Sequence, residues 1–209
     1  MNSFPERMSD HWWWRPGVRP GRRVLVWHIL LHDQPGVRAL AAEYQCRLDG
    51  IGGLDPVPAE WLHLTTQIVG FEDEIGPAEV RNLTAAVAER LRALGPVTVD
   101  IGESLFYTEA VVLGVRPAGA LDPVRHGIRA AMTETAGIPR LDDGPGWEPH
   151  VSVAYSNAEE PAGPIRHALR SRPEPCQATI RDVHLVAQAR AGHVYRWERL
   201  ATVALGGSG

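Results

Sequence analysis

Two short stretches of the chain each place a histidine two residues before a hydroxyl side chain. Residues 61–71 read Trp-Leu-His-Leu-Thr-Thr-Gln-Ile-Val-Gly-Phe, and residues 147–156 read Trp-Glu-Pro-His-Val-Ser-Val-Ala-Tyr-Ser. The first stretch contains His63 and Thr65, and the second contains His150 and Ser152. A bare His-x-[Ser/Thr] triplet arises readily by chance. Two triplets with an aromatic residue upstream and an apolar residue after each histidine form a repeated pattern.

These residue types suit proton transfer at a phosphate. Neutral imidazole accepts a proton and imidazolium donates one near pH 7, so two facing histidines supply the base and the acid for in-line displacement at phosphorus. The hydroxyls of Thr65 and Ser152 would donate hydrogen bonds to the non-bridging oxygens, where transition-state charge builds up. Because the histidines handle the protons, the pattern predicts no metal and no other cofactor. A metal site built from His28, His63 and His150 is the alternative, and it predicts bound zinc.

The side-chain pattern predicts that both histidines lie on strands. From residue 150 onward, polar and apolar side chains alternate, as they do on a β-strand with two different faces. Pro149 favours extended backbone at the residue before it. His150 and Ser152 then share the face that borders a cleft. Tyr155 is predicted to point to the opposite face and pack in the core, with contact to a substrate as the alternative.

The other segments predict the scaffold that brings the two histidine strands together. Further strands are expected at 24–31, 97–101, 110–116, 178–188 and 193–204, and helices at 33–48, 77–94, 122–136 and 161–172. Residues 51–60 are expected to form a loop, and residues 142–146 a flexible approach to the second histidine strand. No glycine-rich phosphate loop follows a strand, which argues against Rossmann and P-loop folds. The order β-α-β-α-β-β-α-β-α-β-β predicts an α+β protein of two sheets covered by helices, with a cleft between its halves.

The N-terminal arm, residues 1–23, is rich in tryptophan and arginine. In one interpretation Arg15, Arg22 and Arg23 meet phosphates while Trp14 and its neighbours stack on bases. In the other, the tryptophans pack as a lid over an apolar edge and the arginines lie in solvent. His28, in the strand that follows, is interpreted as a satisfied histidine that lines the core or the cleft, with substrate contact as the alternative.

Composition limits what the chain binds. It has 209 residues and a formal net charge of −4, and all 21 basic residues are arginine. This charge argues against a protein that coats nucleic acid generally and leaves room for a local basic patch that binds phosphate. Two cysteines, the lack of a signal-peptide pattern and the lack of a long apolar run predict a cytoplasmic protein that binds no membrane. No obligate protein partner is evident.

The two triplets in their contexts resemble the two-histidine (2H) phosphoesterase superfamily, and within it the bacterial 2′-5′ RNA ligase / RNA 2′,3′-cyclic phosphodiesterase branch. Residues 147–150 are similar to the family's aromatic-x-Pro-His approach, and residues 183–197 to its closing strand pair with an internal tyrosine. The resemblance implies a bilobal, pseudo-symmetric α+β fold over residues 24–203. Two antiparallel sheets flanked by helices would enclose a central cleft. Residues 1–23 have no role in the family pattern, and residues 204–209 are expected to be a flexible tail.

The resemblance also implies a function. His63, Thr65, His150 and Ser152 would be the catalytic four, acting without metal or ATP. Their substrates would be RNA ends or nucleotides that bear a 2′,3′-cyclic phosphate, or 2′-5′ linkages, in a hydrolytic or a ligase reaction. The alternative is a module that holds RNA ends or phosphorylated ligands in the same cleft without turnover.

Overall fold

The structure is a computed structural model that describes residues 5–139 and 146–206. Its helices are α1 (Pro35–Leu48), α2 (Pro77–Leu91), α3 (Asp122–Glu134) and α4 (Gly163–Ala168). Its strands are β1 (Val24–Leu30), β2 (Leu54–Pro56), β3 (His63–Phe71), β4 (Val97–Tyr107), β5 (Ala110–Arg116), β6 (His150–Ser156), β7 (Cys176–Ile180), β8 (Asp182–Ala191) and β9 (Val194–Ala204). The 3₁₀ turns η1 (Ala59–Trp61) and η2 (Glu72–Glu74) lie before and after β3.

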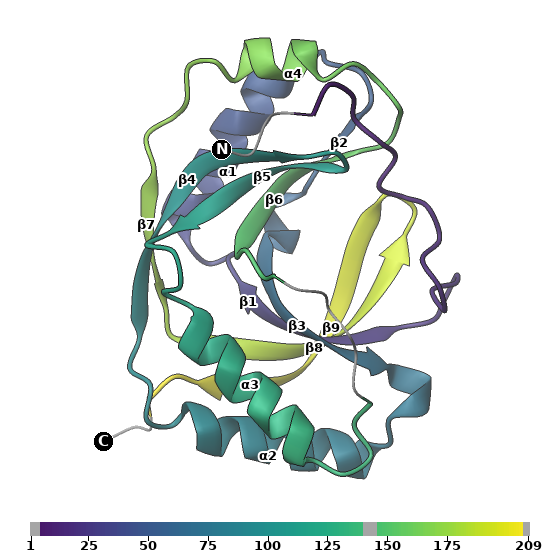
Figure 1. Ribbon diagram of the computed structural model, residues 1–209, viewed down its shortest axis with the longest axis vertical. Helices are drawn as coiled ribbons and strands as arrows, with labels where there is room; N and C mark the ends of the chain where they lie inside the picture. The colour runs from purple at the N-terminus through teal and green to yellow at the C-terminus, as the bar shows by residue number, and fades with distance from the viewer. Residues whose placement is uncertain (1–4, 140–145, 207–209) are drawn as a thin grey trace.

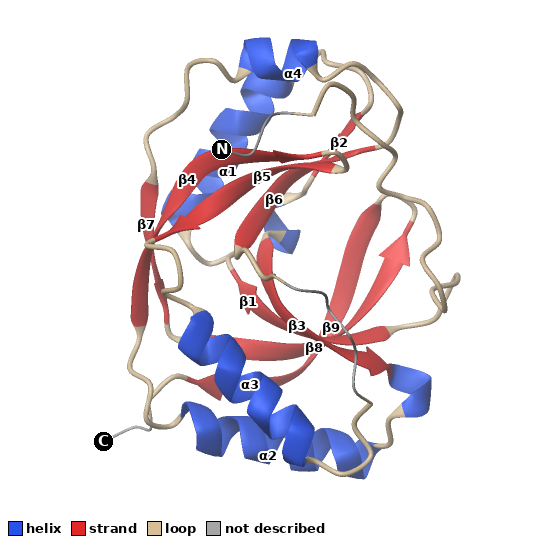
Figure 2. Ribbon diagram, in the orientation of Figure 1, coloured by secondary structure: helices blue, strands red, loops and turns tan. Residues whose placement is uncertain are grey.

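The strands form two antiparallel sheets, and each histidine stretch lies in a different sheet. One sheet has the strand order β3-β1-β8-β9, and the other has the order β2-β6-β5-β4-β7. Helices α2 and α3 pack together on the four-stranded sheet, and α1 and α4 lie on the five-stranded sheet (Figure 1). Figure 2 shows the helices on the outside of the two sheets. The predicted α+β class, with two antiparallel sheets flanked by helices, is confirmed.

The helices bury the apolar stripes that the sequence predicts, because residues three and four apart share one helix face. In α1 the stripe is Val37, Leu40, Ala41, Tyr44 and Leu48, and all of it is buried. The Tyr44 hydroxyl donates a 2.7 Å hydrogen bond to the carbonyl of Gly102, which fastens α1 to β4. Helices α1, α2 and α3 each begin with a proline in the first turn, where the missing N–H breaks no intrahelical bond.

Three strand predictions differ from the structure. The strand expected over 178–188 is two strands, β7 and β8, which separate at Arg181 and belong to different sheets. A continuous run of β-forming residues carries no local mark of that change, because the choice of sheet depends on the partners β4 and β1. The expected 51–60 loop contains β2, which pairs with β6. Strand β4 continues to Tyr107, beyond its predicted end at residue 101, by pairing with β5.

The C-terminal prediction was also wrong in part. Ala204 ends β9, and Leu205 is 4% exposed. The N–H of Leu205 donates to the carbonyl of Arg181 at 2.7 Å, and the N–H of Gly206 donates to the carbonyl of Leu91 at 3.3 Å. The chain is therefore packed through residue 206, because the apolar Leu205 side chain gains from burial. Residues 207–209, and residues 142–145 of the expected flexible approach, lie outside the described part of the chain.

Both histidine strands contain an irregularity in their pairing. Where β1 pairs with β3, Trp27 and His28 lie opposite Gln67 and Thr65. Thr66 therefore has no partner on β1 and is passed over in the pairing, as in a β-bulge. Where β5 pairs with β6, the neighbours Val111 and Val112 lie opposite Ala154 and Ser152, so Val153 is passed over. An extra residue of this kind shifts the alternation of side chains beyond it. Beyond Thr65 in β3 and Ser152 in β6, the side chains on a given face of the sheet therefore lie one position later than strict alternation predicts.

Candidate active site

A cavity of about 530 Å³ lies where the two sheets face each other, and both histidine strands border it. Strand β3 contributes His63 and Thr65, and strand β6 contributes His150 and Ser152. Strands β1, β8 and β9, the β4–β5 turn and the N-terminal arm complete the walls. The other lining residues are His11, Trp13, Arg15, Val18, Arg22, Val24, Val26, His28, Ile68, Tyr107, Thr108, Glu109, Ala110, Tyr155, Gln188, Ala189, Arg190 and Tyr195.

The two histidines are held in the same way. Nδ1 of His63 bonds to the carbonyl oxygen of Trp61 at 2.8 Å, and Nδ1 of His150 bonds to the carbonyl oxygen of Glu148 at 2.8 Å. A carbonyl oxygen only accepts hydrogen bonds, so each Nδ1 carries a proton and donates it. In the neutral ring Nε2 is then the nitrogen with a lone pair. Each strand thus fixes the tautomer that leaves Nε2 available for proton exchange.

Burial lowers the pKa of both imidazoles. The pKa of His63 falls to about 4, first because the ring is removed from water and then because His150 is near, against the opposing effect of the hydrogen bond to Trp61. Desolvation also lowers the pKa of His150, against the opposing effects of the Glu148 carbonyl and carboxylate. Both rings are therefore neutral at pH 7. An anion bound between them would stabilise the charged form and raise both pKa values.

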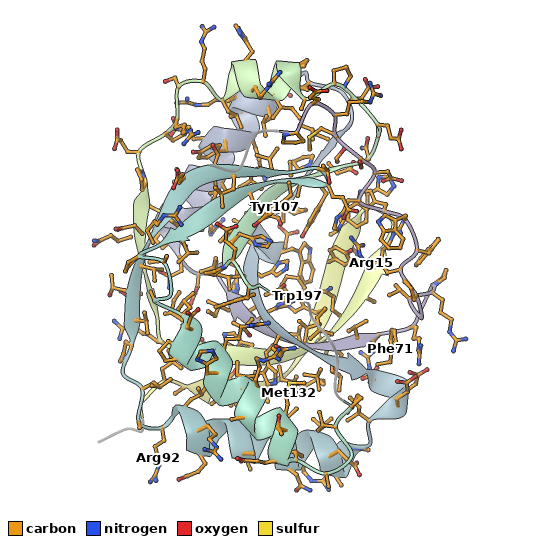
Figure 3. All side chains as sticks on the ribbon, viewed as in Figure 1. Arg15, Phe71, Arg92, Tyr107, Met132 and Trp197 are labelled. Atoms are coloured by element: carbon orange, nitrogen blue, oxygen red, sulfur yellow. The ribbon has the colours of Figure 1, made fainter. Side chains whose placement is uncertain are left out.

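Each histidine ring rests against an aromatic ring from another strand. Tyr107, at the end of β4, has its ring centroid 5.3 Å from that of His150. Trp197, on β9, has its centroid 4.9 Å from that of His63. Figure 3 labels both aromatic residues near the middle of the molecule. The Tyr107 hydroxyl donates to Glu148 at 2.8 Å, and burial together with that bond raises the pKa of Tyr107. These contacts limit the rotation of the two imidazoles.

The hydroxyl residues lie beside the histidines, as the alternation predicts. Thr65 is half-buried and Ser152 is 8% exposed, and both line the cavity. The next residue along β3, Thr66, is buried and its hydroxyl donates to the carbonyl of Trp27 at 2.8 Å. Thr66 therefore stabilises the irregular pairing of β1 with β3, whereas Thr65 and Ser152 are placed to meet a ligand from the cavity wall.

His28 lines the cavity but is tied to the protein. It is 1% exposed, and its Nε2 lies 2.8 Å from Oε1 of Gln188. Its ring centroid is 4.3 Å from that of His63. Burial and the nearness of His63 hold the pKa of His28 well below its ordinary value. His28 is thus a neutral ring packed against His63, and its Nδ1 is buried without a hydrogen-bond partner among the described residues. The interpretation as a satisfied histidine therefore holds for Nε2 but not for Nδ1.

Tyr155 packs in the core as predicted, but it does not point away from the cleft, and that part of the prediction was wrong. Because Val153 is passed over in the pairing, the alternation shifts and Tyr155 faces the cavity together with His150 and Ser152. Its ring stacks on His11 of the arm, with centroids 4.2 Å apart, and only 9% of the residue is exposed. Burial raises the pKa of its hydroxyl to about 12. The tyrosine is buried by the arm and at the same time forms part of the cavity wall.

The predicted arginine ligands are already paired with carboxylates. Arg15 donates to Glu109 at 2.7 Å, and Arg22 donates to Asp73 and Glu74. Both line the cavity. Arg23 pairs with Glu72 and Glu198 and does not line it. The hypothesis that Arg23 meets the substrate phosphate was therefore wrong, because its guanidinium joins η2 to β9.

The tryptophans of the arm divide between the two interpretations. Trp12 is 3% exposed, and its Nε1 donates to Asp55 at 2.8 Å, so it packs as a lid. Trp13 and Trp14 are 50% and 47% exposed. Trp13 lines the cavity, but Trp14 does not, because its ring lies under the guanidinium of Arg190 at 4.3 Å. Base stacking by Trp14 inside the cavity is therefore not supported.

The sequence interpretation missed several residues of the cavity wall. Tyr107 and Glu109 fall between the strands expected at 97–101 and 110–116, and Arg190 falls between those expected at 178–188 and 193–204. The sequence carried only a weak signal for these residues, because a polar residue at a strand end or a turn is ordinary.

Within the described residues, no group of His, Cys, Asp and Glu is placed to hold a metal ion. No helix in the same part of the chain is long and apolar enough to cross a membrane.

Comparisons with known proteins place this geometry in context. The family model of the 2′-5′ RNA ligase superfamily matches residues 34–192. No curated protein matches the chain. TT0787 of Thermus thermophilus is 22% identical, with a TM-score of 0.68 over 89% of this chain and 100% of that chain. E. coli LigT complexed with 3′-AMP is 19% identical, with a TM-score of 0.65 over 88% and 98%. The MHV ns2 PDE domain is 14% identical, with a TM-score of 0.51 over 86% and 99%. These solved structures share the fold of this chain.

Proposed function

The chain belongs to the 2′-5′ RNA ligase superfamily, and on that premise we propose that it is a metal-independent phosphodiesterase. The proposed substrates are RNA ends or nucleotides that carry a 2′,3′-cyclic phosphate, with 2′-5′ linkages as the other bond open to the same chemistry. The observation that carries the proposal is the pair His63 and His150, which reach one cavity from different sheets with equivalent Nδ1 bonds. E. coli LigT, which has this fold, forms a complex with 3′-AMP, and this supports a nucleotide ligand.

In the proposed reaction the two Nε2 atoms handle one proton each. A neutral histidine takes a proton from water as its oxygen attacks phosphorus, and the other histidine, as imidazolium, gives a proton to the ribose oxygen that leaves. One phosphorus–oxygen bond forms and one breaks, and the product is a phosphomonoester. The Nδ1–H of each ring stays on its carbonyl throughout, so neither ring needs to reorient. Thr65 and Ser152 donate to the non-bridging oxygens as charge builds on them.

The test is turnover of a 2′,3′-cyclic nucleotide and of a cyclic-ended RNA in the presence of a chelator. His63→Ala and His150→Ala should each lower kcat by about 10²–10⁴-fold, the usual contribution of one acid or base. His126→Ala is the matched control, because His126 is exposed on α3 and does not line the cavity. Full activity in both cavity variants would refute the proposal. Tight binding with no product from the unmodified protein would instead favour a module that only holds RNA ends.

A further inference from the structure

The N-terminal arm, described from residue 5 to residue 23, forms one side of the cavity and lies outside the 34–192 family match. It runs from the five-stranded sheet to the four-stranded sheet along one edge of the molecule (Figure 1). The N–H of His11 donates to the carbonyl of Ser156 at 2.9 Å, which ties the arm to β6. At its other end, Arg22 pairs with Asp73 and Glu74. The arm is therefore anchored to both sheets, and its cavity-lining side chains have defined positions.

Trp13 is an aromatic ring held at the cavity edge with half of its surface open. Its Nε1 donates to Oε1 of Glu109 at 2.9 Å, and the guanidinium of Arg15 lies 4.9 Å from the ring centroid. Even so, 50% of the residue is exposed. A ring that is already positioned loses little conformational entropy when a flat ligand stacks on it. Such stacking contributes about 1–3 kcal/mol per nucleobase and tolerates any base.

Arg190 brings a positive charge to the same cavity, and its environment differs from that of Arg15 and Arg22. Its guanidinium donates to the carbonyls of Trp12 and Gly192. It also lies over the ring of Trp12 at 5.2 Å. None of the described carboxylates forms an ion pair with it. A positioned guanidinium without an acidic partner favours a phosphate oxygen as its ligand.

We propose that the arm and the end of β8 form a second nucleotide subsite beside the histidine pair. Trp13 stacks on the base of the nucleotide that precedes the cyclic end, and Arg190 binds the phosphodiester that joins the two nucleotides. This inference rests on the proposed function and names its substrate class as RNA oligonucleotides rather than mononucleotides. The charged side chains agree with an anionic ligand, because three arginines and one glutamate line the cavity.

The test compares kcat/KM for a cyclic mononucleotide and for a cyclic-ended dinucleotide with the same terminal nucleoside. The unmodified protein should prefer the dinucleotide by about tenfold, from about 1.4 kcal/mol of stacking. Trp13→Ala should remove this preference through KM, and Trp13→Phe, which keeps a ring but loses the bond to Glu109, should retain most of it. Leu200→Ala is the matched control, because it also truncates an exposed apolar side chain and Leu200, on β9, does not line the cavity. Equal preference in all four proteins, or the same loss in Leu200→Ala, would overturn the subsite.

A second measurement separates the subsite from catalysis. A 3′-phosphorylated dinucleotide, which resembles a product, can be titrated by calorimetry whether or not turnover occurs. Trp13→Ala should weaken its binding about tenfold relative to the Leu200→Ala control. Arg190→Gln should reduce the slope of log affinity against log salt by about 0.7, the value for one phosphate contact on a single strand, whereas Arg190→Lys should preserve it. Unchanged affinity in Trp13→Ala would refute the subsite even if the enzyme proved inactive, and weakened binding without turnover would refute only the proposed function.

Discussion

Strands β3 and β6 carry the same arrangement in different surroundings. In each strand the histidine bonds through Nδ1 to the carbonyl two residues before it. In each, the hydroxyl follows two residues later and the next residue is passed over in the pairing. In each, the fifth residue after the histidine, Ile68 or Tyr155, then lines the cavity. The equivalence is local, because backbone geometry sets it within one strand.

The difference between the two strands comes from what packs against them. Tyr155 is stacked on His11 and is 9% exposed, whereas Ile68 is 42% exposed. His63 has the neutral ring of His28 beside it, and His150 has the carboxylate of Glu148 nearby. One side of the cavity is therefore closed by the arm and the other is open. Similar arrangements of histidine and hydroxyl on the two strands do not make a symmetric site.

Substitutions of Thr65 and Ser152 are expected to give the largest difference between the variants that test this comparison of the two strands. Thr65→Val and Ser152→Ala should each lower kcat by about 10²-fold, because each removes a donor to the charge that develops in the transition state. Thr66→Val is the control. It loses a buried bond to the Trp27 carbonyl, so we expect about 1–3 kcal/mol less stability and no comparable loss of rate. A rate loss in only one of the two hydroxyl variants would break the functional equivalence of the strands.

The pH dependence of stability should separate the two histidines. The pKa of His63 is about 4 in the folded protein and about 6.5 in an unfolded chain. Between these values the unfolded state binds more protons, so stability falls as the pH drops from 6.5 to 4, by about 3 kcal/mol in total. Urea unfolding between pH 4.5 and 7.5 should show a flatter profile for His63→Gln. His150→Gln should flatten it less, since Glu148 favours the charged form of His150, and equal flattening would contradict the asymmetry.

The smallest expected effect is a change in stability on substitution of Ile68 or Tyr155, the residues five positions after each histidine. Tyr155→Leu removes a stacked ring from a buried cluster with His11, Trp12 and Tyr195, so it should cost about 1–2 kcal/mol of stability. Ile68→Ala, at an exposed site, should change stability by less than about 0.5 kcal/mol. Chemical denaturation of both variants measures the difference. Similar losses would mean that the arm does not stabilise the β6 side of the cavity.

Much of the fold follows from patterns within single segments. The stripe in α1 from Val37 to Leu48, and the prolines that open the helices, predict where the helices lie because period and capping are local properties. The split of 178–188 into β7 and β8 could not be predicted in this way. Both halves favour a strand, and only their partners β4 and β1 assign them to different sheets.

The candidate site likewise has residues that local sequence predicted and residues that it misplaced. The two triplets predicted which four residues border the cavity, because alternation puts His and hydroxyl on one face of a strand. Tyr155 was misplaced, since a passed-over residue such as Val153 leaves no reliable mark in sequence. Arg23 and Trp14 were misplaced for another reason. Their contacts are with Glu198 and Arg190, which lie far away along the chain.

The sequence by itself determined the two local units, His63 with Thr65 and His150 with Ser152, because their spacing and strand context are written within a few consecutive residues. Tertiary structure alone decided that both units open onto one cavity, that the arm closes one side of it, and that Arg190 lies there with no acidic partner among the described residues. The physical reason is that burial, charge pairing and sheet partners depend on contacts between residues distant in sequence, and no short stretch of the chain encodes those contacts.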